Sequence, residues 1–153
     1  MLVGKKFESR FYKELESLGI YWYSFYDYPG KVEGNNLRFM AKNPYDVFYY
    51  YCGMLYCIEL KTTGGGLFSI GRNKMIKPHQ VSSLHKAHMR GCRAGFLLES
   101  REKGFIWFVK IEDFLNFVEV SGKCSINWYD ISVIGFCLGK SIKGIVDSIS
   151  NSY

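Results

Sequence analysis

The stretch YDVFYYYCGMLYCIELKT, residues 45–62, decides the fold because it predicts two strands joined by a tight turn at Cys52-Gly53. Aromatic and branched apolar side chains fill both halves, and such residues favour strands. A turn of two residues predicts an antiparallel hairpin, in which the start of the first strand lies beside the end of the second. Alternate strand residues share a face, so Glu59 and Lys61 point the same way.

The rest of the chain predicts one domain, residues 1–153, in which helices pack on a sheet. Apolar residues at helical spacing, together with glycine and proline punctuation, predict helices at 5–18, 78–90, 111–120 and 141–149. Further strands are expected at 20–28, 94–98 and 105–110, a turn at Pro29-Gly30 with an exposed loop after it, and a short strand or packed loop at 131–136. This order indicates a mixed central sheet flanked by helices, in the α/β or α+β class.

Composition favours a globular protein with a polyanionic partner. The chain of 153 residues is 48% hydrophobic and 18% aromatic, and its net charge is +6. No apolar run is long enough for a membrane span, and the early charges do not resemble a signal peptide, so we expect a cytoplasmic protein. Five cysteines without a Cys-x-x-Cys pair argue against a disulfide scaffold or a zinc site, and we expect them to be small, mostly buried residues.

Asp46 could make the Glu59–Lys61 pair part of a metal site. Position 46 precedes the hairpin turn by about as many residues as position 59 follows it, so the two carboxylates are expected to be near neighbours. Paired carboxylates repel unless a proton or cation lies between them, and Mg²⁺ binds one or two carboxylates together with waters and substrate phosphate. Lys61 could then orient an attacking water. The alternative is an ordinary salt bridge at the rim of the sheet.

Four segments together resemble RecU-type Holliday junction resolvases, members of the PD-(D/E)XK nuclease superfamily. They are GKKFESRF on the first helix, Pro44-Tyr45-Asp46, CIELKTT on the central strand, and KPHQVSSLHKAHM on a later helix. The resemblance covers roughly residues 4–110 and implies a restriction-endonuclease-like fold. It implies an active site of Glu8, Asp46, Glu59, Lys61 and Gln80, with Asp46, Glu59 and Glu8 around the metal. Taken alone, the position of Glu8 favours a solvated charge on the helix surface, and Gln80 could be a surface amide.

The resemblance also implies an activity and partners. It predicts a Mg²⁺-dependent homodimer, in which Mn²⁺ could substitute, that cuts four-way DNA junctions by paired phosphodiester hydrolysis. Residues 28–45, where the protruding stalk of that family would fall, form a short stretch. Two alternatives stay open: a nuclease for linear or nicked duplex DNA in repair or restriction, and a non-catalytic DNA-binding module of the same fold.

A basic, glycine-rich loop follows the central strand. Its spacing Gly66-x4-Gly71 approaches a phosphate-binding P-loop, but Arg72-Asn73 stands where that motif requires Lys-Ser or Lys-Thr, so no nucleotide cofactor is expected. We interpret the loop as a contact for a DNA backbone, the alternative being an ordinary flexible surface loop. The expected DNA-binding residues are Lys5, Lys6, Arg72, Lys74 and Lys77.

Overall fold

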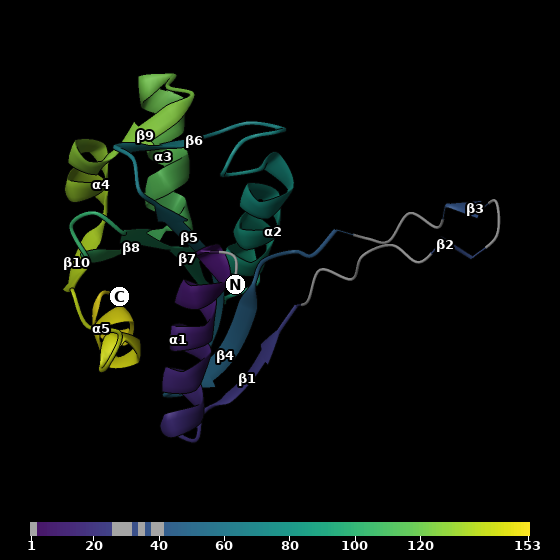
Figure 1. Cartoon of the computed structure of the whole chain (residues 1–153), viewed down its shortest axis with the longest axis vertical. Coiled ribbons are helices and arrows are strands. Elements are labelled where there is room, and N and C mark those ends of the chain that lie inside the picture. Colours follow the sequence, from purple (N-terminus) through teal and green to yellow (C-terminus); the bar gives the residue numbers. More distant parts are fainter. Residues whose placement is uncertain (1–2, 26–31, 34–35, 38–41) are drawn as a thin grey trace.

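The computed structural model describes residues 3–25, 32–33, 36–37 and 42–153, and shows a sheet with helices on both faces (Figure 1). The helices are α1 (Val3–Ser17), α2 (Pro78–Met89), α3 (Ile111–Ser121), α4 (Trp128–Ile134) and α5 (Ile145–Asn151). The strands are β1 (Tyr21–Ser24), β2 (Val32–Glu33), β3 (Asn36–Leu37), β4 (Val47–Tyr51), β5 (Met54–Thr63), β6 (Leu67–Ser69), β7 (Arg93–Ser100), β8 (Ile106–Lys110), β9 (Ser125–Asn127) and β10 (Phe136–Gly139). The expected mixed α+β class is confirmed.

The main sheet has the order β1-β4-β5-β7-β8-β10, so β5 lies in its middle. The β4–β5 hairpin turns at Cys52 and Gly53, whose φ angles of 49° and 78° are both positive, as a two-residue hairpin turn requires. Val47 pairs with Ile58 across this hairpin. On its other side β5 runs parallel to β7, while the remaining neighbours in the sheet are antiparallel, which makes the sheet mixed.

Two apolar clusters cover the two faces of the sheet. Phe7, Phe11 and Leu15 of α1 pack with α5 against one face. The other face carries α2, α3 and α4, with Leu84 and Phe114 among the buried side chains. Because successive residues of β5 alternate between the clusters, Ile58 and Leu60 face α1, whereas Cys57 faces α2. Glu59 and Lys61 therefore lie on the α2 face.

The C-terminal third differs from the sequence prediction. Residues 128–134 form α4, where β-branched residues had favoured a strand or loop at 131–136. A local capping box decides the outcome: Asn127 Oδ1 accepts from the backbone nitrogen of Asp130, and Asp130 Oδ2 accepts from that of Asn127. The strand begins only at Phe136, beside β8. A second small sheet, β6 with β9, was also not predicted.

Two predictions about buried residues were wrong. The apolar spacing of the helix expected at 5–18 predicts that Leu18 is buried, but α1 ends at Ser17, and 47% of the surface of Leu18 is exposed. The cysteines are free thiols, as expected, yet Cys57 alone is buried, and three of the other four are exposed. Composition therefore did not predict how deeply these residues lie.

Strands β2 and β3 pair with each other and stand away from the main sheet in Figure 1. They occupy part of the segment that was expected to be an exposed loop and a short stalk. The predicted Pro29-Gly30 turn and residues 26–28 of the predicted first strand lie outside the described residues. Among the helices that the structure describes, none is long and apolar enough to cross a membrane.

Candidate active site

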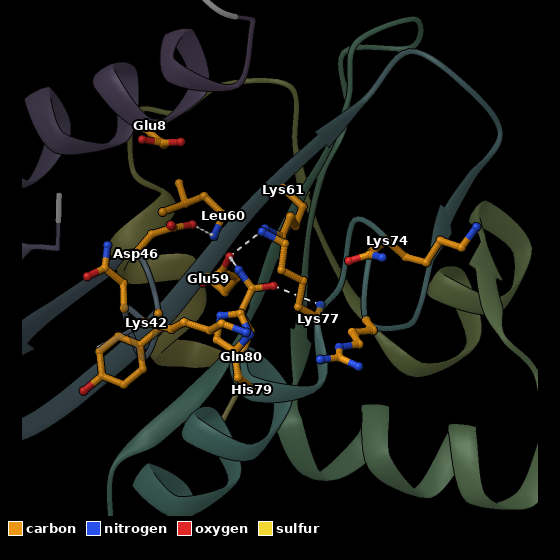
Figure 2. Close-up of a pocket in the computed structure, with 14 residues that line it drawn as sticks. Glu8, Lys42, Asp46, Glu59, Leu60, Lys61, Lys74, Lys77, His79 and Gln80 are labelled. Atoms are coloured by element: carbon orange, nitrogen blue, oxygen red, sulfur yellow. Dashed lines mark hydrogen bonds and ion pairs between the residues drawn. The ribbon is translucent and has the colours of Figure 1, made fainter. Parts of the chain in front are cut away.

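A cavity of about 590 Å³ opens at the C-terminal part of β5, on the side where α2 begins (Figure 2). All five residues predicted for the active site line it, although they come from α1, the approach to β4, β5 and α2. These residues are Glu8, Asp46, Glu59, Lys61 and Gln80. The fold therefore brings together side chains that are separated by up to 72 positions in the sequence, as counted from 8 to 80.

Asp46 is fixed to the central strand by a backbone hydrogen bond. It immediately precedes β4, and the pairing of Val47 with Ile58 places position 46 opposite position 59. The backbone nitrogen of Leu60 donates to Asp46 Oδ2 at 2.7 Å. The predicted neighbourhood of Asp46 and Glu59 is thus confirmed, and it follows from the hairpin register.

Glu59 lies at the centre of the polar contacts. Its side chain is 1% exposed, and its Oε1 accepts from the amide of Gln80 and lies 2.6 Å from the ammonium of Lys61. Its Oε2 is buried and has no hydrogen-bond partner among the described residues. Burial raises the pKa of Glu59, the charge and hydrogen bond of Lys61 and the nearby Asp46 oppose that rise, and the charge of Glu8 adds to it.

Gln80 is buried, which answers the question of whether it is a surface amide. It occupies the first turn of α2, which begins at Pro78. Proline suits this position because it has no backbone N–H, and the first N–H groups of a helix have no partner within the helix. Gln80 Oε1 accepts from the backbone nitrogen of Lys77 at 3.0 Å, while Nε2 donates to Glu59. Both ends of the amide are thereby used, and α2 is tied to β5 at the edge of the cavity.

Glu8 reaches the cavity from α1, on the opposite side from Gln80 (Figure 2). It is half-buried and close enough for its charge to raise the pKa of Glu59. Within the described part of the chain, no three His, Cys, Asp or Glu side chains converge into a cluster that could hold a metal by themselves. The carboxylates of Asp46 and Glu59 are close neighbours, and Glu8 lines the same cavity from farther away.

Basic side chains surround the rim. Arg72, Lys74 and Lys77 are exposed and line the cavity, so three of the five residues predicted to contact DNA gather there. Lys5 and Lys6 are exposed on α1 and are not among the lining residues. Six further residues that were not predicted for the site also line the cavity: Lys42, Asn43, Tyr45, Leu60, Asn73 and His79. Each lies within four positions of a predicted residue, and this closeness in sequence is the signal that could have found them.

Comparison with known proteins supports the fold. No family model matches the sequence. A relative is the SPbeta prophage-derived uncharacterized protein YotM of Bacillus subtilis (strain 168), 30% identical over 128 residues that cover 78% of this chain and 62% of that protein. The chain thus spans less than two thirds of that relative. Among solved structures, Hjc of Archaeoglobus fulgidus, a Holliday junction resolvase, matches with a TM-score of 0.58 and 17% identity, over 88% of this chain and 96% of Hjc.

Proposed function

We propose that this protein is a divalent-metal-dependent endodeoxyribonuclease whose preferred substrate is the four-way DNA junction. One observation carries the proposal: the buried carboxylate of Glu59 has one oxygen occupied by Lys61 and Gln80, and a second oxygen without a partner among the described residues. An acceptor buried in this way is costly unless a cation or proton binds it. A rim salt bridge would leave neither oxygen buried.

The donor set fits a hard divalent cation. Asp46 and Glu59 supply carboxylate oxygens from neighbouring strands, and Mg²⁺ or Mn²⁺ prefers such ligands while keeping water and phosphate in its remaining positions. Asp46 and Glu59 would hold the ion, and Glu8 would assist through water or a second ion. Bound there, the ion would supply Lewis-acid stabilisation to a phosphoryl group.

The remaining side chains have separable roles in hydrolysis. Lys61 keeps an ammonium at the edge of the cavity with 18% of its side chain exposed, where it can orient a water and offset charge on the phosphate. Gln80 holds the Glu59 carboxylate in one orientation. Arg72, Lys74 and Lys77 bind the phosphates of the incoming strand, since exposed cations at a rim attract a polyanion.

The preference for junctions rests on two likenesses. The motifs resemble RecU-type resolvases, and a solved structure with a matching fold is that of a junction resolvase. We propose that two copies act together in the cytoplasm, because a two-fold dimer suits a substrate that is cut at two symmetric positions. The alternatives are a nuclease for linear or nicked duplex and a DNA-binding module without activity.

A cleavage assay tests the proposal. Wild-type protein is incubated with a four-way junction, or with a linear duplex that has the same arm sequences, in Mg²⁺ or in chelator. In Mg²⁺ we expect the junction to be cut by two symmetric nicks and the linear duplex to stay intact. In chelator we expect neither substrate to be cut. Lys61→Ala should lower the rate by a factor on the order of 10² to 10³ while binding persists. Lys86→Ala, which removes an exposed lysine from α2 outside the cavity, is the matched control.

Each other result selects another function. Equal cleavage of junction and duplex would select a duplex nuclease. Salt-sensitive binding without cleavage in Mg²⁺ or Mn²⁺ would select a non-catalytic module. A Lys61→Ala protein that cuts at the wild-type rate would refute the proposed role of the ammonium.

A further inference from the structure

A second cavity, of about 610 Å³, lies beside the N-terminal half of α1, on the α1 face of the sheet. Its walls come from α1, the end of β7, the turn before β8, and the residue after β10. Four basic side chains line it, and one lining residue is acidic. The basic residues are Lys6, Arg10, Arg101 and Lys140. None of the residues to which the proposed cleavage reaction gives a role lines this cavity.

Glu99, the acidic lining residue, is already occupied by two partners. It is 8% exposed at the end of β7, where one carboxylate oxygen accepts from Arg10 and the other accepts from Thr62 Oγ1 at 3.0 Å. Glu99 thus neutralises Arg10 and joins α1 to β5. Lys6, Arg101 and Lys140 form no ion pair within the described part of the chain. Three exposed cations therefore surround the cavity without a counter-charge.

The two cavities lie on opposite sides of the same strand end. Lys61 and Thr62 are consecutive in β5, so Lys61 points into the first cavity and Thr62 toward Glu99 in the second. On α1, Glu8 lines the first cavity, and the next residue, Ser9, lines the second. Residues that serve the two cavities thus follow one another directly in β5 and in α1.

Three exposed glycines follow β5 between these two groups of residues. Gly64, Gly65 and Gly66 present backbone without side chains, which lets another backbone approach closely. A Cβ atom on Gly64 would come within 2.9 Å of Nη2 of Arg101, so the guanidinium lies directly against this bare segment. The cation of Arg101 is thus placed between the glycine segment and the second cavity.

We propose that the second cavity is a phosphate-binding site for the DNA backbone that flanks the cleaved bond, with Lys6, Arg101 and Lys140 as its phosphate contacts. This proposal rests on the proposed function, because it extends the path of the same DNA across the end of β5. Phosphates in the cavity release counterions from the DNA and supply the charge that the three cations lack. The site contributes affinity and position but takes no part in hydrolysis.

The test measures binding of the same junction and duplex at several salt concentrations, in chelator so that no cleavage occurs. Each of Lys6→Ala, Arg101→Ala and Lys140→Ala should lower the magnitude of the slope of log affinity against log salt by about 1, and the triple variant by about 3. Between about 50 and 200 mM salt, the affinity advantage of the wild type over the triple variant should shrink about fortyfold. Lys86→Ala is the control for loss of one charge away from both cavities.

Two further measurements separate a binding site from a general charge effect. In Mg²⁺, the triple variant should need a higher junction concentration than the wild type for half-maximal cleavage, whereas Lys86→Ala should need the wild-type concentration. Gly64→Ala, whose new methyl group displaces the Arg101 guanidinium, should weaken binding in the direction of Arg101→Ala.

The proposal is overturned if the triple variant keeps the wild-type salt slope, or if Lys86→Ala lowers the slope as much as each cavity variant does. A wild-type protein that binds DNA and responds to these variants but never cleaves would refute the nuclease function and retain the phosphate site. If the wild-type protein cleaves and the triple variant binds DNA as the wild type does, the phosphate site is refuted and the nuclease function is retained.

Discussion

The carboxylate of Asp46 and the backbone nitrogen of Leu60 are joined by a hydrogen bond of 2.7 Å, so an acidic side chain before one strand is held by the main chain of the next. This bond needs an acceptor oxygen but no negative charge. We expect Asp46→Asn to keep the bond, and hence the fold, while cleavage falls by a factor on the order of 10² or more, because the side chain proposed to bind the metal has lost its charge. Thermal unfolding and junction cleavage of the same preparation give the two readouts. Equal loss of stability and activity would contradict the assignment.

Glu59 offers a test of metal binding that does not depend on activity. Mg²⁺ at about 100 times its dissociation constant should raise the free energy of unfolding of the wild type by about 2.7 kcal/mol. Glu59→Gln should abolish most of that gain, since a neutral amide replaces the buried carboxylate. Without Mg²⁺ the variant should be at least as stable as the wild type at neutral pH. Urea titrations with and without Mg²⁺ measure the free energies of unfolding of both proteins. If Mg²⁺ stabilises Glu59→Gln as much as it stabilises the wild type, the ion binds elsewhere.

Gln80 contacts both Glu59 and the start of α2, so its proposed role in positioning Glu59 can be tested apart from its role in stability. Gln80→Ala should cost about 1–2 kcal/mol of stability, since it removes the acceptor for the Lys77 nitrogen and one donor to Glu59. It should also weaken Mg²⁺ affinity by about 10- to 100-fold. Ser82→Ala, at an exposed position of the same helix, is the matched control. Mg²⁺ affinity measured by calorimetry decides the issue, because a purely structural role would leave it unchanged.

The capping box of α4 predicts a dependence of stability on pH. A hydrogen bond from Lys123, at 2.7 Å, and one from the backbone of Asn127 lower the pKa of Asp130 below its ordinary value of 3.8. A carboxyl whose pKa is lower in the folded state stabilises the fold above the ordinary pKa, and that contribution is lost as the pH falls through the lowered pKa.

The difference in unfolding free energy between wild type and Lys123→Ala should therefore be present at pH 6 and shrink as the pH falls below 3.8. Urea unfolding across this range measures it. In an Asp130→Asn background, Lys123→Ala should have little effect at any pH. A constant difference in both backgrounds would contradict the predicted coupling.

Gly95 permits the close contact of β7 with β8. A Cβ atom there would lie 2.4 Å from the carbonyl oxygen of Val109 and 2.8 Å from the ring of Phe108, and the backbone oxygen has no room to move. Gly95→Ala should therefore destabilise the protein by about 3 kcal/mol. Gly66→Ala, where no atom lies within 4 Å of the added Cβ, should change stability little. Urea midpoints of the two variants provide the comparison.

The sequence predicted the parts of the fold that depend on local chemistry. The Cys52-Gly53 turn and the alternation of side chains determine the register that brings Asp46 beside Glu59, because a hairpin is closed by residues next to one another in the chain. Helix α2 was predicted correctly at its start because Pro78 marks it. These same local signals placed Lys61 beside Glu59.

Features of the fold that depend on contacts between distant segments could not be predicted from local sequence signals. The burial of Gln80 follows from the packing of α2 against β5, and the second cavity depends on Lys6 lying near Lys140. Neither relation leaves a spacing pattern in the sequence. At α4, β-branched residues suggested a strand, but the reciprocal bonds of Asn127 and Asp130 outweigh the weak propensity of those residues.

Lys61 and Thr62 contact acidic partners on opposite faces of β5, and this pairing makes the site sensitive to errors of assembly. A strand that settled one residue out of place would turn Lys61 toward the α1 side and remove Glu59 from Gln80. The bond of Thr62 to Glu99 would be lost in the same event. A misassembled chain would therefore lose the contacts of Glu59 with Lys61 and Gln80 on which the proposed cleavage depends.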